Sequence, residues 1–266
     1  MTLLAQISDL HITRPGERVC GKSDTAAFLA RCVARLTAFA PRIDAVLVTG
    51  DLVEAGDAAE YAHLRELLAP LALPTYVMLG NHDDRGAFRR AFADCAYVPR
   101  DGFVQFAFDT GALRVIALDT NDAGKPGGRL CAERRAWLAA ELRAAGERPV
   151  LLAMHHPPFA TGIGFMDECG LAPDDAAALA ELVRAHGRVE RIVCGHLHRP
   201  IATRFAGTVA MTAPSCAHQV ALALEPGARA AFTFEPPAFL LHALSPDADL
   251  VTHQVAIEPA DGPHLY

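Results

Sequence analysis

Apolar runs of strand length end in polar clusters at five places in this chain, and this pattern constrains the fold more than any other feature. Between the runs lie segments with apolar residues at helical spacing, such as residues 24–40, which end just before Pro41. Strands that alternate with amphipathic helices assemble into sheets covered by helices. The sequence therefore predicts a mixed α/β protein with two sheets and outer helices.

The predicted elements follow one another in βαβ order as far as about residue 200. Strands are expected at residues 2–8, 44–50, 74–79, 103–108, 113–119, 149–154 and 190–194. Helices are expected at residues 24–40, 58–69, 83–92, 132–145 and 173–186. From about residue 201 only strand-like segments separated by turn signals follow. We therefore expect one domain over residues 1–266, with about 215–266 forming a β-rich cap or oligomerisation extension.

Composition narrows the possible partners and location. Of the 266 residues, 52% are hydrophobic, which allows a large buried core, and the formal net charge is -7. This acidic balance disfavours a nucleic-acid partner or an anionic membrane surface. No segment has the pattern of a secretory leader or a membrane helix, and the seven cysteines are scattered singly, as expected for reduced thiols. We therefore expect a cytoplasmic protein with neither nucleic acid nor membrane as a partner.

The polar clusters carry carboxylate, imidazole and amide groups at the ends of predicted strands. They comprise Asp9 with His11, Asp51, Asn81 with His82 and Asp83, His155 with His156, and His196 with His198. Ligands of open α/β sheets collect beyond the carboxyl ends of the strands, so we expect these residues to converge. The mixture suits Fe, Mn, Zn or Co better than Mg or Ca, which prefer oxygen ligands alone.

The number of candidate ligands indicates two metal ions. One ion with four to six ligands and an open position cannot use all seven candidates, which are Asp9, His11, Asp51, Asn81, His155, His196 and His198. Two ions suit the set if Asp51, which has two carboxylate oxygens, bridges them. Each cluster taken alone is better explained as a turn, a helix N-cap or a buried histidine, but their number and order together favour a metal site.

The series DLH, GD, GNHD, HHPP and GHLH resembles the signature of the calcineurin-like metallophosphoesterases, with all five motifs complete and in the family's order. The segment HITRPGERVCGKSDT, with GNHDD, MHHPP and AHQV, resembles the bacterial class III cyclic-nucleotide phosphodiesterases and the related glycerophosphodiesterase. The similarity covers most of residues 1–220. It implies a four-layer αββα sandwich that hydrolyses small phosphodiesters, such as 3',5'-cyclic nucleotides or glycerophosphodiesters, by a metal-activated hydroxide.

The resemblance also assigns the ligands to two ions. It implies that one ion is held by Asp9, His11, Asp51 and His198. It implies that the second ion is held by Asp51, Asn81, His155 and His196. Two ions close together bind a phosphoryl oxygen and lower the pKa of a water molecule, which is the chemistry that phosphoester hydrolysis needs.

Other residues receive roles toward the substrate from the same resemblance. His82 would contact the phosphate or assist the leaving group as a catalytic residue, and Asn81 would also touch the substrate. Asp83 would orient His82 for catalysis, or alternatively cap the helix expected at 83–92. His218 would face the substrate, or alternatively hold the end of a strand.

The sequence leaves alternative functions open. A phosphomonoesterase or a nucleotide pyrophosphatase of the same fold is the main alternative, and a non-catalytic metal-binding scaffold is another. The complete ligand set and the presence of His82 argue against a scaffold, and the acidic composition argues against a nuclease. Relatives with a β-rich C-terminal extension associate through it, so we expect at least a homodimer.

Overall fold

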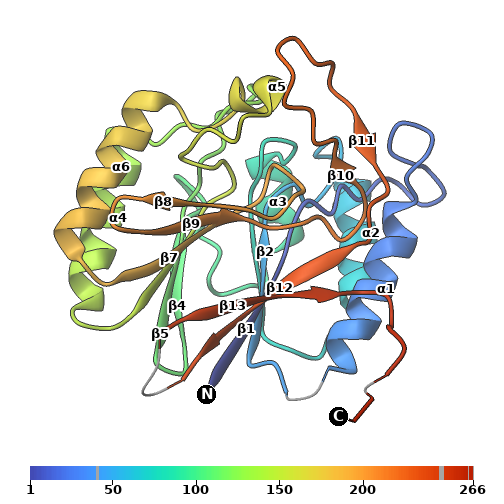
Figure 1. Cartoon of the computed structure of the whole chain (residues 1–266), viewed down its shortest axis with the longest axis horizontal. Coiled ribbons are helices and arrows are strands. Elements are labelled where there is room, and N and C mark those ends of the chain that lie inside the picture. Colours follow the sequence, from blue (N-terminus) through green and yellow to red (C-terminus); the bar gives the residue numbers. More distant parts are fainter. Residues whose placement is uncertain (40–41, 246–248, 263, 266) are drawn as a thin grey trace.

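Two sheets face each other and are covered by helices on their outer sides (Figure 1). The computed structural model describes residues 1–39, 42–245, 249–262 and 264–265. The first sheet has the strand order β13 (Val251–Ala256), β12 (Ala238–Leu244), β1 (Thr2–Ile7), β2 (Ala45–Thr49) and β3 (Thr75–Met78). The second has the order β4 (Phe106–Thr110), β5 (Leu113–Ala117), β6 (Val150–Ala153), β7 (Val189–Cys194), β9 (Thr208–Thr212) and β8 (Ile201–Phe205).

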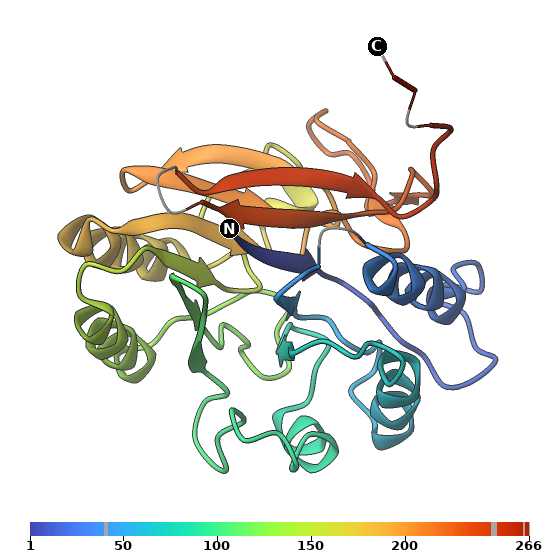
Figure 2. The same ribbon diagram turned by 90° about the horizontal axis from the view of Figure 1, so that it is seen from below.

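The helices cover opposite faces of this pair of sheets (Figures 1 and 2). On the side of the first sheet lie α1 (Thr25–Thr37), α2 (Ala58–Leu68) and α3 (Arg85–Ala91). On the side of the second sheet lie α4 (Ala132–Ala145) and α6 (Pro173–His186), and the short α5 (Gly164–Asp167) belongs to a loop above the sheets. None of the helices in the described ranges is long and apolar enough to span a bilayer.

Three layers of apolar side chains fill the spaces between these four layers. Alternation along β1 shows how they form: Leu4 packs between the two sheets, whereas Leu3 and Ala5 pack toward α1. In the second sheet Leu151 faces the first sheet and Leu152 faces α4 and α6. The predicted four-layer αββα sandwich is confirmed.

The C-terminal strands lie partly within this body. β12 pairs antiparallel to β1, with Thr2 opposite Leu244, and β13 pairs along the outer edge of β12. Six of the seven residues of β12 are buried because both faces of the strand are covered. β12 and β13 thus extend the first sheet, whereas β10 (Gln219–Val220) and β11 (Phe232–Thr233) form a two-stranded ladder outside it. Of the strands in the expected extension, β10 and β11 are those that lie outside the two main sheets.

The hairpin of β4 and β5 is shifted from its predicted position. β4 begins at Phe106 instead of residue 103 and continues through Asp109 and Thr110, which were expected in the turn. Gly111 makes the turn with a φ of 55°, a conformation that favours glycine. The Val104 N–H donates to a carboxylate oxygen of Asp119 instead of joining the ladder, at 2.9 Å.

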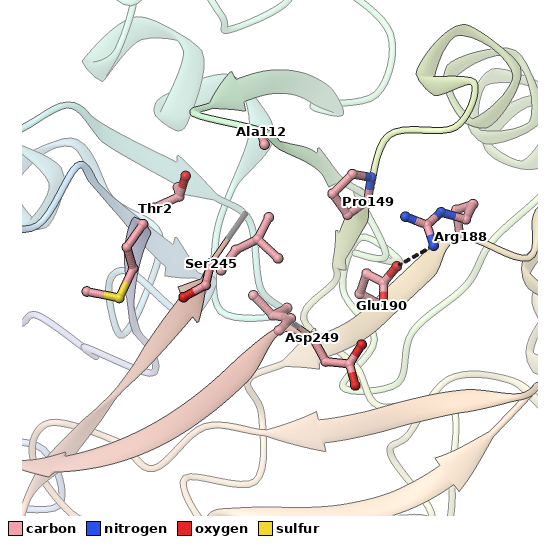
Figure 3. A pocket seen from close by; sticks show the side chains of 10 residues that line it. Thr2, Ala112, Pro149, Arg188, Glu190, Ser245 and Asp249 are labelled. Atoms are coloured by element: carbon pink, nitrogen blue, oxygen red, sulfur yellow. Dashed lines mark ion pairs between the residues drawn. The ribbon is translucent and has the colours of Figure 1, made fainter. Parts of the chain in front are cut away.

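A hollow of about 280 Å³ lies at the amino ends of the parallel strands (Figure 3). Thr2, Pro149 and the pair Arg188 and Glu190 are among its lining residues, and the pair is 3.5 Å apart. Because ligands of α/β sheets collect at the opposite ends of the strands, and because no predicted site residue lines it, this hollow is not the candidate functional site.

His242 is a buried neutral histidine that links three strands of the first sheet. Its Nε2 lies 3.1 Å from Gln6 Oε1, and its Nδ1 lies 2.9 Å from the Thr252 hydroxyl oxygen. The Gln6 amide nitrogen donates to Thr49 and to the Cys194 carbonyl, which leaves Oε1 to accept from His242. Burial, with a smaller contribution from the charge of Arg191, lowers the pKa of His242 to about 3.

We expect His242 to make the fold sensitive to acid. Its pKa is lower in the folded than in the unfolded chain, so its contribution is present above about pH 6.5 and is lost as the pH falls toward 3. Between pH 7 and pH 5 the free energy of unfolding should fall by about 2 kcal/mol through this residue. Urea titrations of the wild type and of His242→Gln at both pH values measure this, and an equal pH dependence in the two proteins would contradict it.

Candidate metal centre

The five predicted clusters meet at the carboxyl ends of β1, β2, β3, β6 and β7. Four of the clusters line a pocket of about 450 Å³, with residues that include His11, Asp51, Asn81, His196 and His198. The cluster after β6 adjoins it through His155, whose Nε2 lies 3.2 Å from the amide oxygen of Asn81. β1, β2 and β3 run parallel, as do β5, β6 and β7, so each set delivers its following loops to one edge. All seven predicted ligands are thereby brought together.

The first group of ligands consists of Asp9, His11 and His198. Nε2 of His11 and Nε2 of His198 lie 3.1 Å apart, and His198 Nε2 lies 3.6 Å from Asp9 Oδ1. The other oxygen of Asp9, Oδ2, is buried and has no hydrogen-bond partner among the described residues. A buried carboxylate oxygen without a partner is costly unless a cation compensates it.

The second group consists of Asn81, His155 and His196. The amide oxygen of Asn81 lies 3.2 Å from His155 Nε2 and 3.1 Å from His196 Nδ1. Asp51 lies between the two groups, because its Oδ2 is 3.5 Å from His11 Nε2 and 3.3 Å from His155 Nε2. Its Oδ1 accepts a hydrogen bond from the backbone N–H of His82 at 2.9 Å, which orients Oδ2 toward the histidines.

Outward hydrogen bonds fix which nitrogen of three histidines faces the centre. Nδ1 of His155 contacts the Thr49 carbonyl at 2.8 Å, Nδ1 of His198 contacts the His218 carbonyl at 3.0 Å, and Nδ1 of His11 contacts Glu54 at 2.8 Å. Each Nδ1 therefore carries a proton, and Nε2 is the nitrogen of each ring that faces the centre and would bind a metal once it is unprotonated.

This geometry fits a transition-metal ion in each group. Ligand atoms on one such ion lie about 3.0–3.4 Å apart when metal–ligand distances are about 2.0–2.1 Å. The separations within the groups are close to that range, and imidazole, carboxylate and amide ligands suit Fe, Mn, Zn or Co. The first group would use Asp9, His11 and His198, the second Asn81, His155 and His196, and Asp51 would serve both.

The buried carboxylates and the burial itself shift the pKa values of the four histidines at the centre in opposite directions. Burial lowers the pKa of His11, but the carboxylates of Glu54 and Asp51 outweigh this effect and raise it to about 9. Burial also lowers the pKa of His155, and Asp51 outweighs it and raises that pKa to about 9. Burial and neighbouring histidines lower the pKa of His196 and of His198 to about 3. Because His11 and His155 hold protons at neutral pH, metal binding has to displace those protons.

Five of the seven predicted ligands have a left-handed backbone. The φ angles are 56° at Asp9, 46° at His11, 49° at Asp51, 70° at His196 and 51° at His198. Such residues cost about 1–2 kcal/mol each relative to ordinary backbone, and they cluster at functional sites. Each lies two or four residues after the end of a strand, in the loops that carry the ligands to the centre.

His82 and His218 lie at the pocket, as expected. His82 lines it and donates from Nδ1 to the carbonyl oxygen of Glu54, at 2.7 Å, which leaves Nε2 for the pocket. His218 also lines it, and its buried Nδ1 has no partner within the described part of the chain. Burial and the neighbouring His198 and His11 lower the pKa of His218 to about 3, so its ring is neutral.

Asp83 does not take either of its expected roles. Its carboxylate is buried and accepts hydrogen bonds from the backbone of Gly80 and Leu52 and from the Tyr61 hydroxyl. None of its hydrogen bonds within the described residues goes to the His82 ring, and the N-cap of α3 is Asp84. Asp83 therefore fixes the loop that carries Asn81, and its contacts in the structure are neither the expected hydrogen bond to His82 nor the expected helix cap.

The remaining polar residues near the centre have local partners. Nδ1 of His156 is 2.8 Å from the Thr120 hydroxyl and its Nε2 is 3.2 Å from the Pro126 carbonyl, so neither nitrogen is free for a metal.

Glu54 lines the pocket and contacts His11, but it belongs to none of the motifs that predicted the site. Its only sequence signal was its place three residues after Asp51.

A two-sheet sandwich with carboxylates and imidazoles clustered at its strand ends is an arrangement that can hold metal ions for hydrolysis. The family model for calcineurin-like phosphoesterases matches residues 2–200. The chain therefore belongs to the calcineurin-like phosphoesterases, as its motifs predicted.

Individual relatives and a solved structure agree with this membership. The chain is 34% identical over 264 residues to a probable glycerophosphodiester phosphodiesterase of Arcobacter nitrofigilis, covering 99% of this chain and 96% of the relative. It is 38% identical over 262 residues to a probable cyclic nucleotide phosphodiesterase of Rhodopseudomonas palustris, covering 97% and 93%. A dimetal phosphatase from Danio rerio has the same fold, with a TM-score of 0.70, 16% identity, and coverage of 97% and 96%.

Proposed function

We propose that this phosphoesterase hydrolyses small phosphodiesters, such as 3',5'-cyclic nucleotides or glycerophosphodiesters, with two metal ions. The observation that carries the proposal is the position of Asp51, whose Oδ2 lies within 3.5 Å of His11 and 3.3 Å of His155. One carboxylate oxygen is thus placed where it could serve both groups of ligands. The names of the two relatives support a diester as the substrate.

The protein's own residues position the reactants. When bound, two transition-metal ions supply positive charge for the phosphoryl oxygens and lower the pKa of a water molecule. Asn81 and His218 face the pocket and would contact the phosphate. His82 presents Nε2 to the same space and, in its doubly protonated form, would donate a hydrogen bond from Nε2 to the phosphate or the departing oxygen, which stabilises the charge that develops there.

The pocket offers no cationic side chain of the described residues to the second negative charge of a phosphomonoester. Its lining contains no lysine or arginine within the described part of the chain, and it contains Glu54. Arg14 and Arg199, which flank the ligand clusters, are ion-paired with Asp57 and Glu235. A diester carries one negative charge and a fully ionised monoester carries two, so the Glu54 carboxylate repels the monoester more strongly, while the bound metal ions would attract both.

We therefore expect a diester preference in the Mn(II)-loaded protein. The value of kcat/KM for bis(p-nitrophenyl) phosphate should exceed that for p-nitrophenyl phosphate by about tenfold, which corresponds to about 1.4 kcal/mol. A faster reaction with the monoester would identify a phosphomonoesterase instead. A panel with cyclic AMP, cyclic GMP and glycerophosphoethanolamine then separates the cyclic from the glycerol diesters.

We also propose the identity of the metals, a cellular location and an oligomeric state for this protein. The ions are taken from Fe, Mn, Zn and Co, which the imidazole-rich ligand set favours. A cytoplasmic location is supported by the seven free cysteines. A homo-oligomer of at least two chains is supported by exposed Leu222, Leu224 and Phe234 beside β10 and β11. A function without nucleic acid or an anionic membrane as a partner is supported by the formal net charge of -7.

A further inference from the structure

Glu54 contacts two histidines of the site through different atoms. Its side-chain Oε2 lies 2.8 Å from Nδ1 of His11, and its backbone carbonyl accepts a hydrogen bond from Nδ1 of His82 at 2.7 Å. The two rings meet edge to face, with centroids 4.7 Å apart. The Glu54 side chain is 32% exposed and lines the pocket, so this link lies at the mouth of the centre.

We propose that Glu54 is a positioning residue that joins the first group of metal ligands to His82. Its carboxylate holds the proton of His11 on Nδ1 and directs the Nε2 lone pair toward the centre. Its carbonyl does the same for His82, whose Nε2 then faces the substrate space. This inference rests on the proposed function, because it assigns a role within the same site.

The backbone around Glu54 is held firmly enough to perform this role. The Glu54 N–H donates to the Ile12 carbonyl at 3.1 Å, and Ile12 also forms a parallel bridge with Val53. On the other side, the Ala55 N–H donates to the Glu60 carboxylate at 2.8 Å, within the capping box of α2. The loop after β2 is therefore attached both to the loop after β1, which carries His11, and to α2.

His11, Glu54 and His82 are close enough to be considered as a cation site of their own. The hydrogen bonds argue for the positioning role instead. Nε2 of His11 faces Asp51 and His198, so Nδ1 is the protonated nitrogen and is not available to a second ion. Nδ1 of His82 donates to a carbonyl, and the distance from that nitrogen to the Glu54 carboxylate is 3.9 Å.

Side-chain variants separate the two contacts, because they remove the carboxylate and leave the carbonyl. In the full-length protein, Glu54→Ala should weaken the binding of one Mn(II) ion by about 10–100-fold and leave the affinity of the other unchanged. Glu54→Gln keeps an oxygen that can accept from His11 Nδ1, so it should recover part of that loss. Isothermal titration with Mn(II), together with the Mn(II) EPR spectrum, measures both ions without relying on activity.

Glu235→Gln is the matched control. Glu235 is a carboxylate ion-paired with Arg199 at 2.6 Å and does not line the pocket, so this variant should bind both ions as the wild type does. Thermal unfolding of the variants in the presence of Mn(II) verifies that they are folded.

The outcomes distinguish this inference from the proposed function. If the wild type binds two ions and both Glu54 variants match it, the positioning role is wrong while the two-metal proposal stands. Equal weakening of both ions, or no recovery in Glu54→Gln, would also overturn the positioning role. If the wild type itself binds fewer than two ions, the two-metal function fails first.

Discussion

Replacing Asp51 with asparagine is expected to abolish two-metal binding and to lower kcat/KM for a diester by about 10³-fold or more. Oδ1 of Asp51 accepts the His82 backbone N–H at 2.9 Å, and Oδ2 lies between His11 and His155. Asparagine can keep the first contact, but it then presents an NH₂ group where the bridging oxygen was. That group has no lone pair to share with a metal.

The measurement is the metal content after saturation with Mn(II) and dialysis, followed by diester kinetics. Asp44→Asn provides the control, because Asp44 is a carboxylate near the amino end of β2 that accepts the Leu3 N–H at 2.8 Å. The control variant should retain two equivalents of metal. Two equivalents in Asp51→Asn as well would show that Asp51 is not the bridge.

The two histidines of the GHLH motif are expected to serve different ions, although they are only two residues apart. Nε2 of His198 lies with His11 and Asp9, whereas Nδ1 of His196 lies with the amide oxygen of Asn81. Each single alanine variant should therefore retain about one equivalent of Mn(II) and lose at least about 10²-fold in kcat/KM.

A second substitution tests which ion each variant has lost. Adding Asn81→Ala to His196→Ala should remove no further ion, because both residues belong to the same group. Adding Asn81→Ala to His198→Ala should remove the remaining ion. If the two double variants bind the same amount of metal, His196 and His198 do not divide between two ions.

Local sequence patterns predicted much of the fold, and they predicted which polar side chains would lie close together. Helical spacing and buried strand runs are local properties, so α2 and α6 lie within one residue of their predicted ranges. The motifs at the strand ends indicated which polar residues would converge. The family and the αββα sandwich followed from them and are confirmed.

Features that depend on distant contacts were not predictable in this way. The pairing of β12 with β1 joins residues more than 230 positions apart, and nothing in either strand specifies the other. The choice between Asp83 and Asp84 as the helix cap is decided by Tyr61 and the buried loop backbone. Glu54 becomes part of the site only because the loops after β1 and β2 are attached to each other.

The left-handed backbone at the strand ends has a consequence for engineering this protein. Glycine would adopt the conformation of His198 or Asp9 at lower cost, but it offers no side chain to the site. Selection of variants for heat resistance alone would therefore favour glycine in these loops at the expense of turnover. A more robust version of the protein should be sought instead on exposed helix positions and on the outer strand β13, far from the strained turns.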